Sequence, residues 1–280
     1  MKQKLWTISI VLLFIGGLSL AMYPLVSEWI NSNVQKQLIE AYENNVTESQ
    51  SPDLSDEWEN AQQYNKTLAS GSVVLSEPFD DTKFVPSEEN YKTLLNLDGS
   101  GVMGFIEIPQ ISVSLAIYHT VEDEILRTAA GHLPGTSLPV GGKGTHSVIS
   151  SHRGVASAKL FTDLDKIEMG DVFYIHVLDE VLAYKVDEIN VVEPEDVSKL
   201  AIDKEKDYVT LVTCTPYSVN THRLLVRGVR TEYIPLEDGE EVVSRGLPYG
   251  WQSWGIFLPA VAGLIVLLIL TKKDKNPKQQ

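Results

Sequence analysis

The residue best suited to chemistry is Cys214, the single cysteine of the chain. It lies between two segments rich in β-branched and apolar residues, Tyr208–Thr213 and Arg223–Arg227, which predict a strand, a polar turn and a second strand. Nine positions separate Cys214 from Arg223, so a hairpin would fold the arginine back alongside the thiol. A guanidinium in that place stabilises a thiolate or a developing oxyanion. We therefore predict a nucleophilic cysteine at a strand end; the alternative is a buried structural cysteine beside a surface arginine.

A reactive thiol needs a partner that transfers protons, and the chain has six histidines. His176 lies in the middle of a predicted strand, which indicates a structural role. His222 precedes Arg223 directly, so strand alternation points it to the opposite face from that arginine. His146 and His152 flank one predicted strand about 20 Å long, so at most one of them reaches the thiol. His152 is the better candidate because it follows the strand in a loop, and His146 stays open as the alternative.

The elements that must position these residues are mainly short β-strands. Seven segments are β-rich and bounded by Pro, Gly, Asn or Asp: Met103–Ile108, Ile111–Tyr118, Ser147–Ser150, Val172–Leu178, Leu182–Val192, Val209–Thr213 and Leu224–Val229. Only short helices are expected between them, near Glu122–Ala129 and Ala158–Leu164. Seven or eight strands with so little helix predict a closed or nearly closed β-barrel.

A helical region is expected before the barrel. Apolar residues recur at helical spacing in Asn33–Tyr42 and again in Trp58–Leu68, with a polar break at Asn44–Asp56. The segment Leu75–Asp81 then resembles neither helix nor strand. Pro78 within it holds Glu77 extended and presents Phe79 on a stiff loop, which is either a lid or an ordinary surface loop.

Two uncharged apolar segments, Leu5–Ser27 and Leu247–Thr271, are each long enough to cross a bilayer as a helix. Lysines precede the first segment and four lysines follow the second, which places both termini in the cytoplasm. A cleaved signal peptide is the alternative for the first segment, but its apolar run is too long and no small-residue cleavage site follows it. We therefore predict a two-pass membrane protein with its central domain outside the cell.

The extracellular compartment and the charge narrow the function further. A solitary thiol in an oxidising space is a liability unless it is buried or reactive, which favours the nucleophile. The net charge is −15, and the flanks of the two apolar segments contribute six lysines, so the central domain is more acidic still. That charge argues against nucleic acid and suits a basic partner such as a lysine-bearing protein. Since a lone cysteine among scattered histidines matches no zinc spacing, neither a metal nor a cofactor is expected.

Three stretches together resemble the class C sortases, the pilus-assembling sortases of Gram-positive bacteria. They are GHLPGTSLPVGGKGTHSVISSHRG from Gly131, AKLFTDLDKIEMGD from Ala158 and TLVTCTPYSVNTHRLLVRG from Thr210. The last contains the TLxTC signature of that family, with an arginine nine residues on. The resemblance implies an eight-stranded sortase β-barrel, with Cys214 as nucleophile, His152 as acid/base and Arg223 as the partner of the oxyanion or substrate carbonyl. The second membrane segment also resembles class C.

The resemblance also implies a lid and a division of the chain. Sortases of this class cover their active site with an Asp-Pro-aromatic motif, which Glu77, Pro78 and Phe79 resemble with Glu in place of Asp. Phe79 would lie over Cys214, and Glu77 would pair with Arg223. The expected parts are an N-terminal transmembrane anchor (1–27), a helical region (28–100) with the lid loop around 76–81, the barrel (101–232), a linker (233–246), a C-terminal transmembrane helix (247–271) and a basic cytoplasmic tail (272–280).

The activity implied by the resemblance is acyl transfer between proteins. The enzyme would cleave an LPxTG-like sorting signal between Thr and Gly, keep the acyl group as a thioester and transfer it to a lysine amine of the next pilin subunit. No third carboxylate is required in this family, and the sequence offers no obvious one. Two alternatives remain: a housekeeping-type sortase that anchors surface proteins to cell-wall precursor, and a non-enzymatic, membrane-tethered β-domain.

Overall fold

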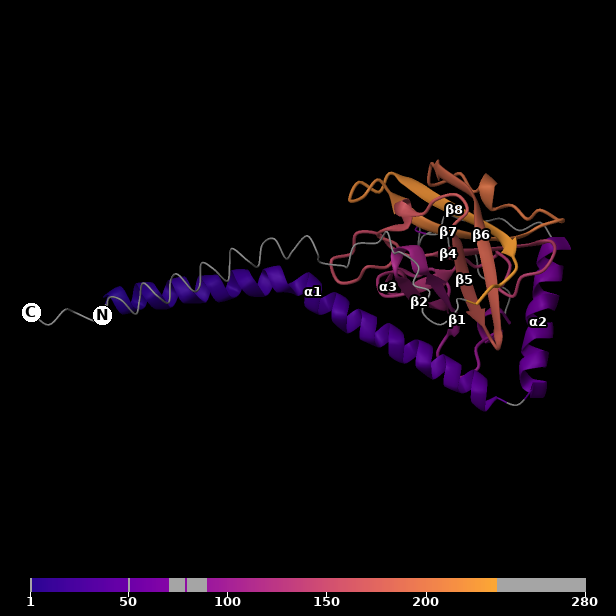
Figure 1. Ribbon diagram of the computed structural model, residues 1–280, viewed down its shortest axis with the longest axis horizontal. Helices are drawn as coiled ribbons and strands as arrows, with labels where there is room; N and C mark the ends of the chain where they lie inside the picture. The colour runs from indigo at the N-terminus through magenta and orange to yellow at the C-terminus, as the bar shows by residue number, and fades with distance from the viewer. Residues whose placement is uncertain (1, 50, 71–78, 80–89, 236–280) are drawn as a thin grey trace, which may run out of the picture.

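The structure, a computed structural model of the chain, describes residues 2–49, 51–70, 79 and 90–235 (Figure 1). Eight strands form a closed barrel in the order β1-β2-β3-β4-β7-β8-β6-β5, which confirms the expected eight-stranded barrel. The strands are β1 (Val102–Ile108), β2 (Val113–His119), β3 (Ala130–His132), β4 (Thr145–Ser150), β5 (Val172–Val177), β6 (Glu180–Val192), β7 (Asp207–Thr215) and β8 (His222–Thr231). The pairs β2–β3 and β4–β7 are parallel, and the other pairs are antiparallel.

Alternate side chains of each strand fill the barrel. Ile106, Ile117, Ile149 and Leu211 have no exposed surface and belong to one core cluster. Burying an aliphatic side chain of this size is worth roughly 1.5–3 kcal/mol, so these positions fix which face of each strand points inward. The opposite face of β4, β7 and β8 consequently points outward, and Cys214 lies on that face because it is an odd number of positions from Leu211.

The seven predicted strands correspond to β1, β2 and β4 to β8, with ends shifted by one or a few residues. The remaining strand, β3, has no counterpart among the predictions. Its sequence Ala-Gly-His contains no β-branched residue and no Phe, Tyr or Trp, so nothing local marks it as a strand. Pairing with β2 on one side and β4 on the other makes it one.

One of the two short helices expected within the barrel is present. The helix predicted at Glu122–Ala129 appears as α3 (Asp123–Leu126). The helix predicted at Ala158–Leu164 is wrong, because these residues form turns and only Leu164–Lys166 makes a single 3-10 turn. Leu160 has φ +45°, a left-handed conformation that an α-helix does not accommodate.

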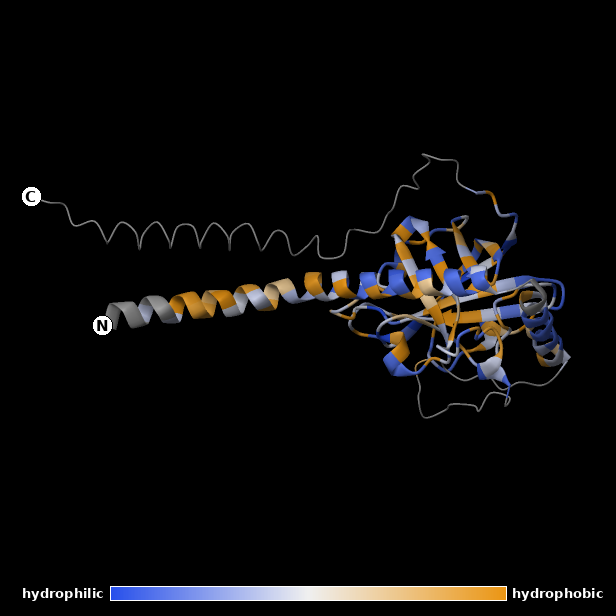
Figure 2. Cartoon of the chain, turned by 90° about the horizontal axis from the view of Figure 1, so that it is seen from below, coloured by the Kyte–Doolittle hydropathy of each residue, from blue (hydrophilic) through white to orange (hydrophobic). Residues whose placement is uncertain are grey.

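The N-terminal helix α1 (Lys2–Glu48) is continuous through the predicted span and the predicted helix Asn33–Tyr42. Its N-terminal half is apolar and projects away from the barrel (Figure 2). Among the described residues, α1 is the one helix long and apolar enough to cross a membrane. The predicted second span, Leu247–Thr271, lies outside the described residues.

Two buried polar side chains of α1 fasten its C-terminal half to the barrel. The Gln35 side chain accepts a hydrogen bond from the Ala116 amide at 2.9 Å and donates one to the Thr128 carbonyl at 3.0 Å. The Tyr42 hydroxyl accepts from the Leu178 amide at 2.7 Å. These bonds join the helix that enters the predicted membrane span directly to the β-domain.

The second helix, α2 (Ser51–Ser70), includes the predicted segment Trp58–Leu68 and lies along the barrel wall (Figure 1). Asn65 holds it there, since its side chain accepts from the Leu138 amide at 2.7 Å and donates to the Leu138 carbonyl at 3.0 Å. The polar break predicted at Asn44–Asp56 is much too long, because α1 continues to Glu48 and α2 already begins at Ser51. A proline in the first turn of a helix is tolerated because the first amides have no partner within the helix, which explains how α2 begins so early.

Candidate active site

Cys214 and Arg223 lie directly opposite each other on neighbouring strands. In the antiparallel register of β7 and β8, Cys214 pairs with Arg223 and Val212 pairs with Leu225. Directly opposed side chains on one face of a sheet have their Cβ atoms about 4.5–5.5 Å apart, so the hairpin places the side chains of Cys214 and Arg223 next to each other. Both residues are largely buried, with 7% of Cys214 and 9% of Arg223 exposed.

The loop between β7 and β8 orients the arginine. The guanidinium Nη1 of Arg223 donates to the backbone carbonyls of Asn220 at 3.2 Å and His222 at 3.1 Å. Asn220 has φ +60°, a left-handed conformation that Asn tolerates better than most residues. The turn thus supplies carbonyl acceptors that hold Arg223 near the strand end where Cys214 lies.

His152 reaches the same place from β4. The parallel register pairs Ser150 with Val212, and His152 and Cys214 each follow two residues later in the same direction along the sheet. The His152 amide donates to the Leu126 carbonyl, and its carbonyl accepts from the Phe161 amide, both at 3.2 Å. The structure therefore brings His152 to the edge where Cys214 and Arg223 lie.

Phe79 is placed between the histidine and the arginine. Its ring centroid is 5.4 Å from that of His152, and the Arg223 Cζ atom lies 5.0 Å from the ring centroid. Glu77 and Pro78, the other two residues of the predicted lid motif, lie outside the described residues. The ring of Phe79 thus bridges the imidazole and the guanidinium on the outer face of the sheet.

Beneath Phe79 lies a group of buried apolar side chains that we call the outer apolar strip. Its members come from several segments around β4, β7 and β8: Leu133, Val148, Leu200, Val212 and Leu225. Phe79 packs against this strip. Because Val148 and Val212 lie on the outward face of their strands, the strip offers an apolar floor that leads to the cysteine, suited to an apolar peptide segment.

The other five histidines lie away from this arrangement or are held by structural bonds. His146, the alternative partner, bonds to the Ala201 carbonyl at 2.9 Å and to the Thr210 hydroxyl at 2.7 Å. Burial lowers the pKa of His146 to about 4, and burial does the same for His132. His146 is therefore a neutral structural histidine at neutral pH.

His176 and His222 also have partners elsewhere. His176 stacks on Phe105 with ring centroids 4.1 Å apart and contacts the Glu107 carboxylate at 2.9 Å. The Nε2 atom of His222 lies 3.3 Å from a carboxylate oxygen of Glu193. His119 is buried and bonds through both ring nitrogens to backbone carbonyls.

Asp123 is a residue of the site that sequence reasoning missed. Its Oδ1 atom lies 2.8 Å from His152 Nε2, and its Oδ2 atom accepts from Arg127 Nε at 2.6 Å. These two hydrogen bonds, first from Arg127 and then from His152, hold the pKa of Asp123 below its usual range. Acidic residues are common in the first turn of any helix, so Asp123 between two glutamates gave no signal of its own. The sequence offers no obvious carboxylate for the histidine, and the structure places Asp123 there.

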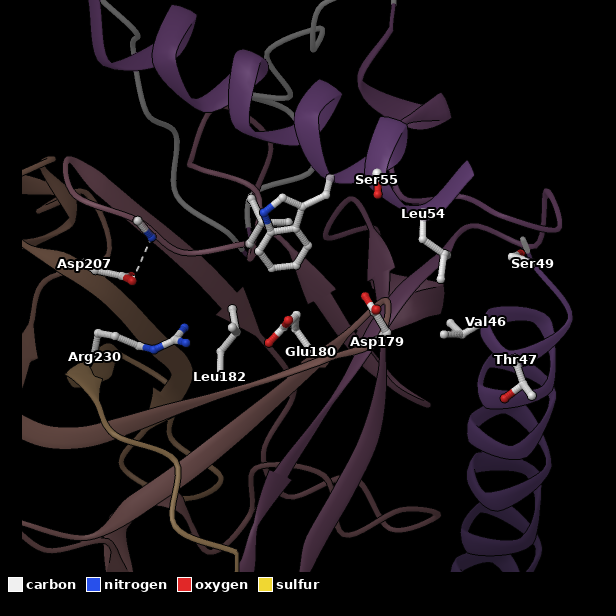
Figure 3. A pocket seen from close by; sticks show the side chains of 13 residues that line it. Val46, Thr47, Ser49, Leu54, Ser55, Asp179, Glu180, Leu182, Asp207 and Arg230 are labelled. Atoms are coloured by element: carbon white, nitrogen blue, oxygen red, sulfur yellow. Dashed lines mark hydrogen bonds between the residues drawn. The ribbon is translucent and has the colours of Figure 1, made fainter. Parts of the chain in front are cut away.

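A cavity of about 900 Å³ lies at the opposite end of the barrel and includes Glu180, Asp207 and Arg230 in its wall (Figure 3). Asp207 begins β7, seven positions before Cys214, so the two are about 23 Å apart along the strand. The Oδ2 atom of Asp207 accepts from the Gly142 amide at 2.8 Å. This cavity is separate from the cysteine. Within the described part of the chain, no group of three or more His, Cys, Asp or Glu side chains is arranged to hold a metal.

The chain is similar to known proteins over the barrel. A family model described as "Sortase domain" matches residues 106–231. The chain is 28% identical over 133 residues to sortase A of Bacillus anthracis, a match that covers 48% of this chain and 61% of that protein. It is 30% identical over 138 residues to sortase A of Listeria monocytogenes, covering 49% of this chain and 60% of that protein. The chain thus spans less than two thirds of the length of these curated relatives.

Solved structures of sortase C proteins are similar over more of their length. The crystal structure of Streptococcus pneumoniae sortase C is 42% identical with a TM-score of 0.64, covering 71% of this chain and all of that one. Sortase C1 of GBS pilus island 1 is 38% identical with a TM-score of 0.67, covering 74% of this chain and 97% of that one. Sortase C-1 of Actinomyces oris is 42% identical with a TM-score of 0.61, covering 64% of this chain and 99% of that one.

Proposed function

The chain belongs to the class C sortases, and on this basis we propose that it is a cysteine transpeptidase that polymerises pilin subunits. In this proposal it cleaves an LPxTG-like sorting signal between Thr and Gly and joins the Thr carbonyl to a lysine amine of the next subunit. The observation that carries the proposal is the pairing of Cys214 with Arg223 on the outward face of the barrel, with His152 at the adjacent strand end.

The three residues divide the chemistry among them. The Cys214 thiolate attacks the Thr carbonyl carbon, and Arg223 stabilises the negative charge that develops on the carbonyl oxygen. The His152 imidazolium donates its proton to the departing Gly amine as the C–N bond breaks, which leaves a thioester. Neutral His152 then accepts a proton from the attacking lysine amine, the thiolate departs, and an isopeptide bond remains. The mechanism requires neither a metal nor a cofactor.

The outer apolar strip is the proposed binding surface for the sorting signal. Three of its side chains, Val148, Val212 and Leu225, lie on the same sheet face as Cys214, on β4, β7 and β8. The Leu and Pro of an LPxTG-like signal are apolar and would cover the strip in place of Phe79. Burial of that apolar surface would contribute to binding, and the register of the strands would guide the Thr carbonyl to the thiol.

The loop around residues 76–81 is the proposed lid. Phe79 supports this assignment because it contacts His152 and Arg223 and packs on the outer apolar strip. In the proposed closed state Phe79 excludes a substrate, and Glu77 pairs with Arg223. The lid must therefore move before a sorting signal reaches Cys214.

The proposed location is the cell membrane, with two spans and the barrel outside the cell. The projecting apolar half of α1 would be the first span, and Leu247–Thr271 would be the second. The lysines flanking both segments would keep both termini in the cytoplasm. Fusion of a reporter active only in the cytoplasm to the C-terminus tests this topology; an inactive, stably produced fusion contradicts it.

The activity is tested with the full chain in detergent, a protein that ends in an LPxTG-like signal, and a pilin that offers a lysine. We expect a covalent product whose peptide map shows a Thr-to-lysine isopeptide bond. Cys214→Ala and His152→Ala should reduce the rate to background, and Arg223→Ala should lower it by about 100-fold or more, the effect of losing one oxyanion donor. His146→Gln is the matched histidine control and should retain activity if folded.

Two results would favour the alternatives. A product with a peptidoglycan amine in place of the pilin lysine would assign the chain to the anchoring kind of sortase. Full function of Cys214→Ala in cells would identify a non-enzymatic β-domain, since a tether has no need of the thiol.

A further inference from the structure

The contact between Asp123 and His152 fixes the protonation pattern of the imidazole. An ionised carboxylate only accepts hydrogen bonds, so the 2.8 Å contact requires a proton on His152 Nε2. The second ring nitrogen, Nδ1, is then the one that gains and loses a proton during a reaction. The carboxylate thereby selects one tautomer of the neutral ring and holds the ring plane.

Asp123 is itself held in place. Its Oδ2 atom accepts from Arg127 Nε at 2.6 Å, one helical turn further along the chain. The second carboxylate oxygen is left for His152, and the arginine keeps the group ionised. The side chain of Asp123 is 43% exposed and that of His152 is 21% exposed, so the pair lies at the surface edge of the site.

The same short segment also holds the backbone of the histidine. The Leu126 carbonyl accepts from the His152 amide at 3.2 Å, and the Ala129 carbonyl accepts from the Ser151 hydroxyl at 2.8 Å. The Thr128 carbonyl accepts from Gln35 of α1 at 3.0 Å. Residues 123–129 therefore bind the imidazole of His152, bind the backbone of His152, and are hydrogen-bonded to the N-terminal helix α1.

We propose that Asp123 is a positioning residue that holds His152 with its proton on Nε2 and its Nδ1 free to exchange a proton at the thiol and at the amine. The inference rests on the proposed role of His152 as acid/base. It adds a carboxylate partner to the three residues already named. The negative charge also stabilises the imidazolium that accompanies the thiolate.

The test compares four full-length variants in the transpeptidation assay: Asp123→Asn, Asp123→Glu, Glu124→Gln and His152→Ala. Asp123→Asn keeps the size of the side chain, and we expect kcat to fall by about 10-fold or more while KM changes less than about twofold. Asp123→Glu restores the charge and should recover part of the loss. The neighbouring Glu124 is exposed, and among the described residues the carboxylate that bonds to His152 is that of Asp123, so Glu124→Gln should match the wild type.

A second readout separates orientation from a general structural effect. Long-range ¹⁵N–¹H spectra of histidine-labelled protein report which ring nitrogen carries the proton, and His152 is identified by its absence from His152→Ala. We expect the Nε2–H form in the wild type and a mixture with the Nδ1–H form in Asp123→Asn. Thermal melting verifies that the variants are folded.

Three outcomes overturn the inference: a wild-type kcat in Asp123→Asn, a lower kcat with an unchanged tautomer, or no recovery in Asp123→Glu. Full activity of His152→Ala refutes the proposed role of His152 itself.

Discussion

Removing the ring of Phe79 should expose the thiol of Cys214 to reagents. In Phe79→Ala three contributions to the covered state disappear. The cation–π contact between Arg223 and the ring, with Cζ 5.0 Å from the ring centroid, contributes about 0.5–2 kcal/mol. The ring pair with His152 at 5.4 Å adds about 0.5 kcal/mol or more. The apolar contact with the outer strip adds roughly 1 kcal/mol for a half-buried ring.

These terms are not independent, because one movement of the ring breaks all of them together. A net loss of about 2 kcal/mol changes the ratio of covered to uncovered states by about 30-fold. If iodoacetamide reaches Cys214 only in the uncovered state, the modification rate should rise by a similar factor. The modification rate cannot rise further once most molecules are in the uncovered state.

The assay follows the mass of the intact chain under excess iodoacetamide at a fixed pH. Tyr233→Ala is the matched control, since Tyr233 packs edge-on against Tyr174 and not at the cysteine. Its rate should equal that of the wild type. An unchanged rate in Phe79→Ala, with the protein folded, would refute the lid assignment and leave residues 76–81 as an ordinary surface loop.

Three further predictions concern stability. Tyr42→Phe leaves the Leu178 amide without its acceptor and should lower the free energy of unfolding by about 1–3 kcal/mol in urea titration; no change would show that water replaces the hydroxyl. The Ser150 hydroxyl is buried and has no hydrogen-bond partner among the described residues, so Ser150→Ala should leave the melting temperature unchanged or raise it, and a clear decrease would contradict this. His132 and His146, whose pKa values burial lowers to about 4, stay neutral in the folded state while the unfolded chain takes up protons below pH 6.5. These neutral histidines stabilise the folded state fully above pH 6.5, and that stabilisation is lost as the pH falls toward 4. The free energy of unfolding should therefore fall by about 1–2 kcal/mol per histidine between pH 7 and pH 5. His146→Gln should flatten that slope, and an unchanged slope would contradict the assignment.

The hairpin is the part of the site that sequence alone describes best. The two β-rich segments and the polar turn between them are local features, and a separation of nine positions lets a hairpin place Cys214 and Arg223 opposite each other. Spacing and a loop position favour His152 over His146, and the resemblance to class C sortases points to the same residue. The structure gives a physical reason for it, since both ring nitrogens of His146 are engaged in hydrogen bonds, to the Ala201 carbonyl and the Thr210 hydroxyl.

The tertiary structure decides contacts between segments that no local pattern connects. Asp123 is 29 positions from His152, and the hydrogen bond between them depends on how α3 is placed beside the end of β4. Strand β3 exists because β2 and β4 lie on either side of it, not because of its own side chains. Phe79 reaches His152 and Arg223 from far earlier in the chain.

By itself, then, the sequence determined the β-rich domain, the apolar N-terminal segment, and the thiol and guanidinium as neighbours across a turn. Each of these follows from side-chain periodicity or short spacing, which a linear chain displays directly. Only the tertiary structure decided which carboxylate meets His152, which ring lies between the imidazole and the guanidinium, and which short segment becomes the strand between β2 and β4. Those outcomes arise from closing the barrel, because closure brings together residues that are far apart in the sequence, and sequence separation does not predict their distance in space.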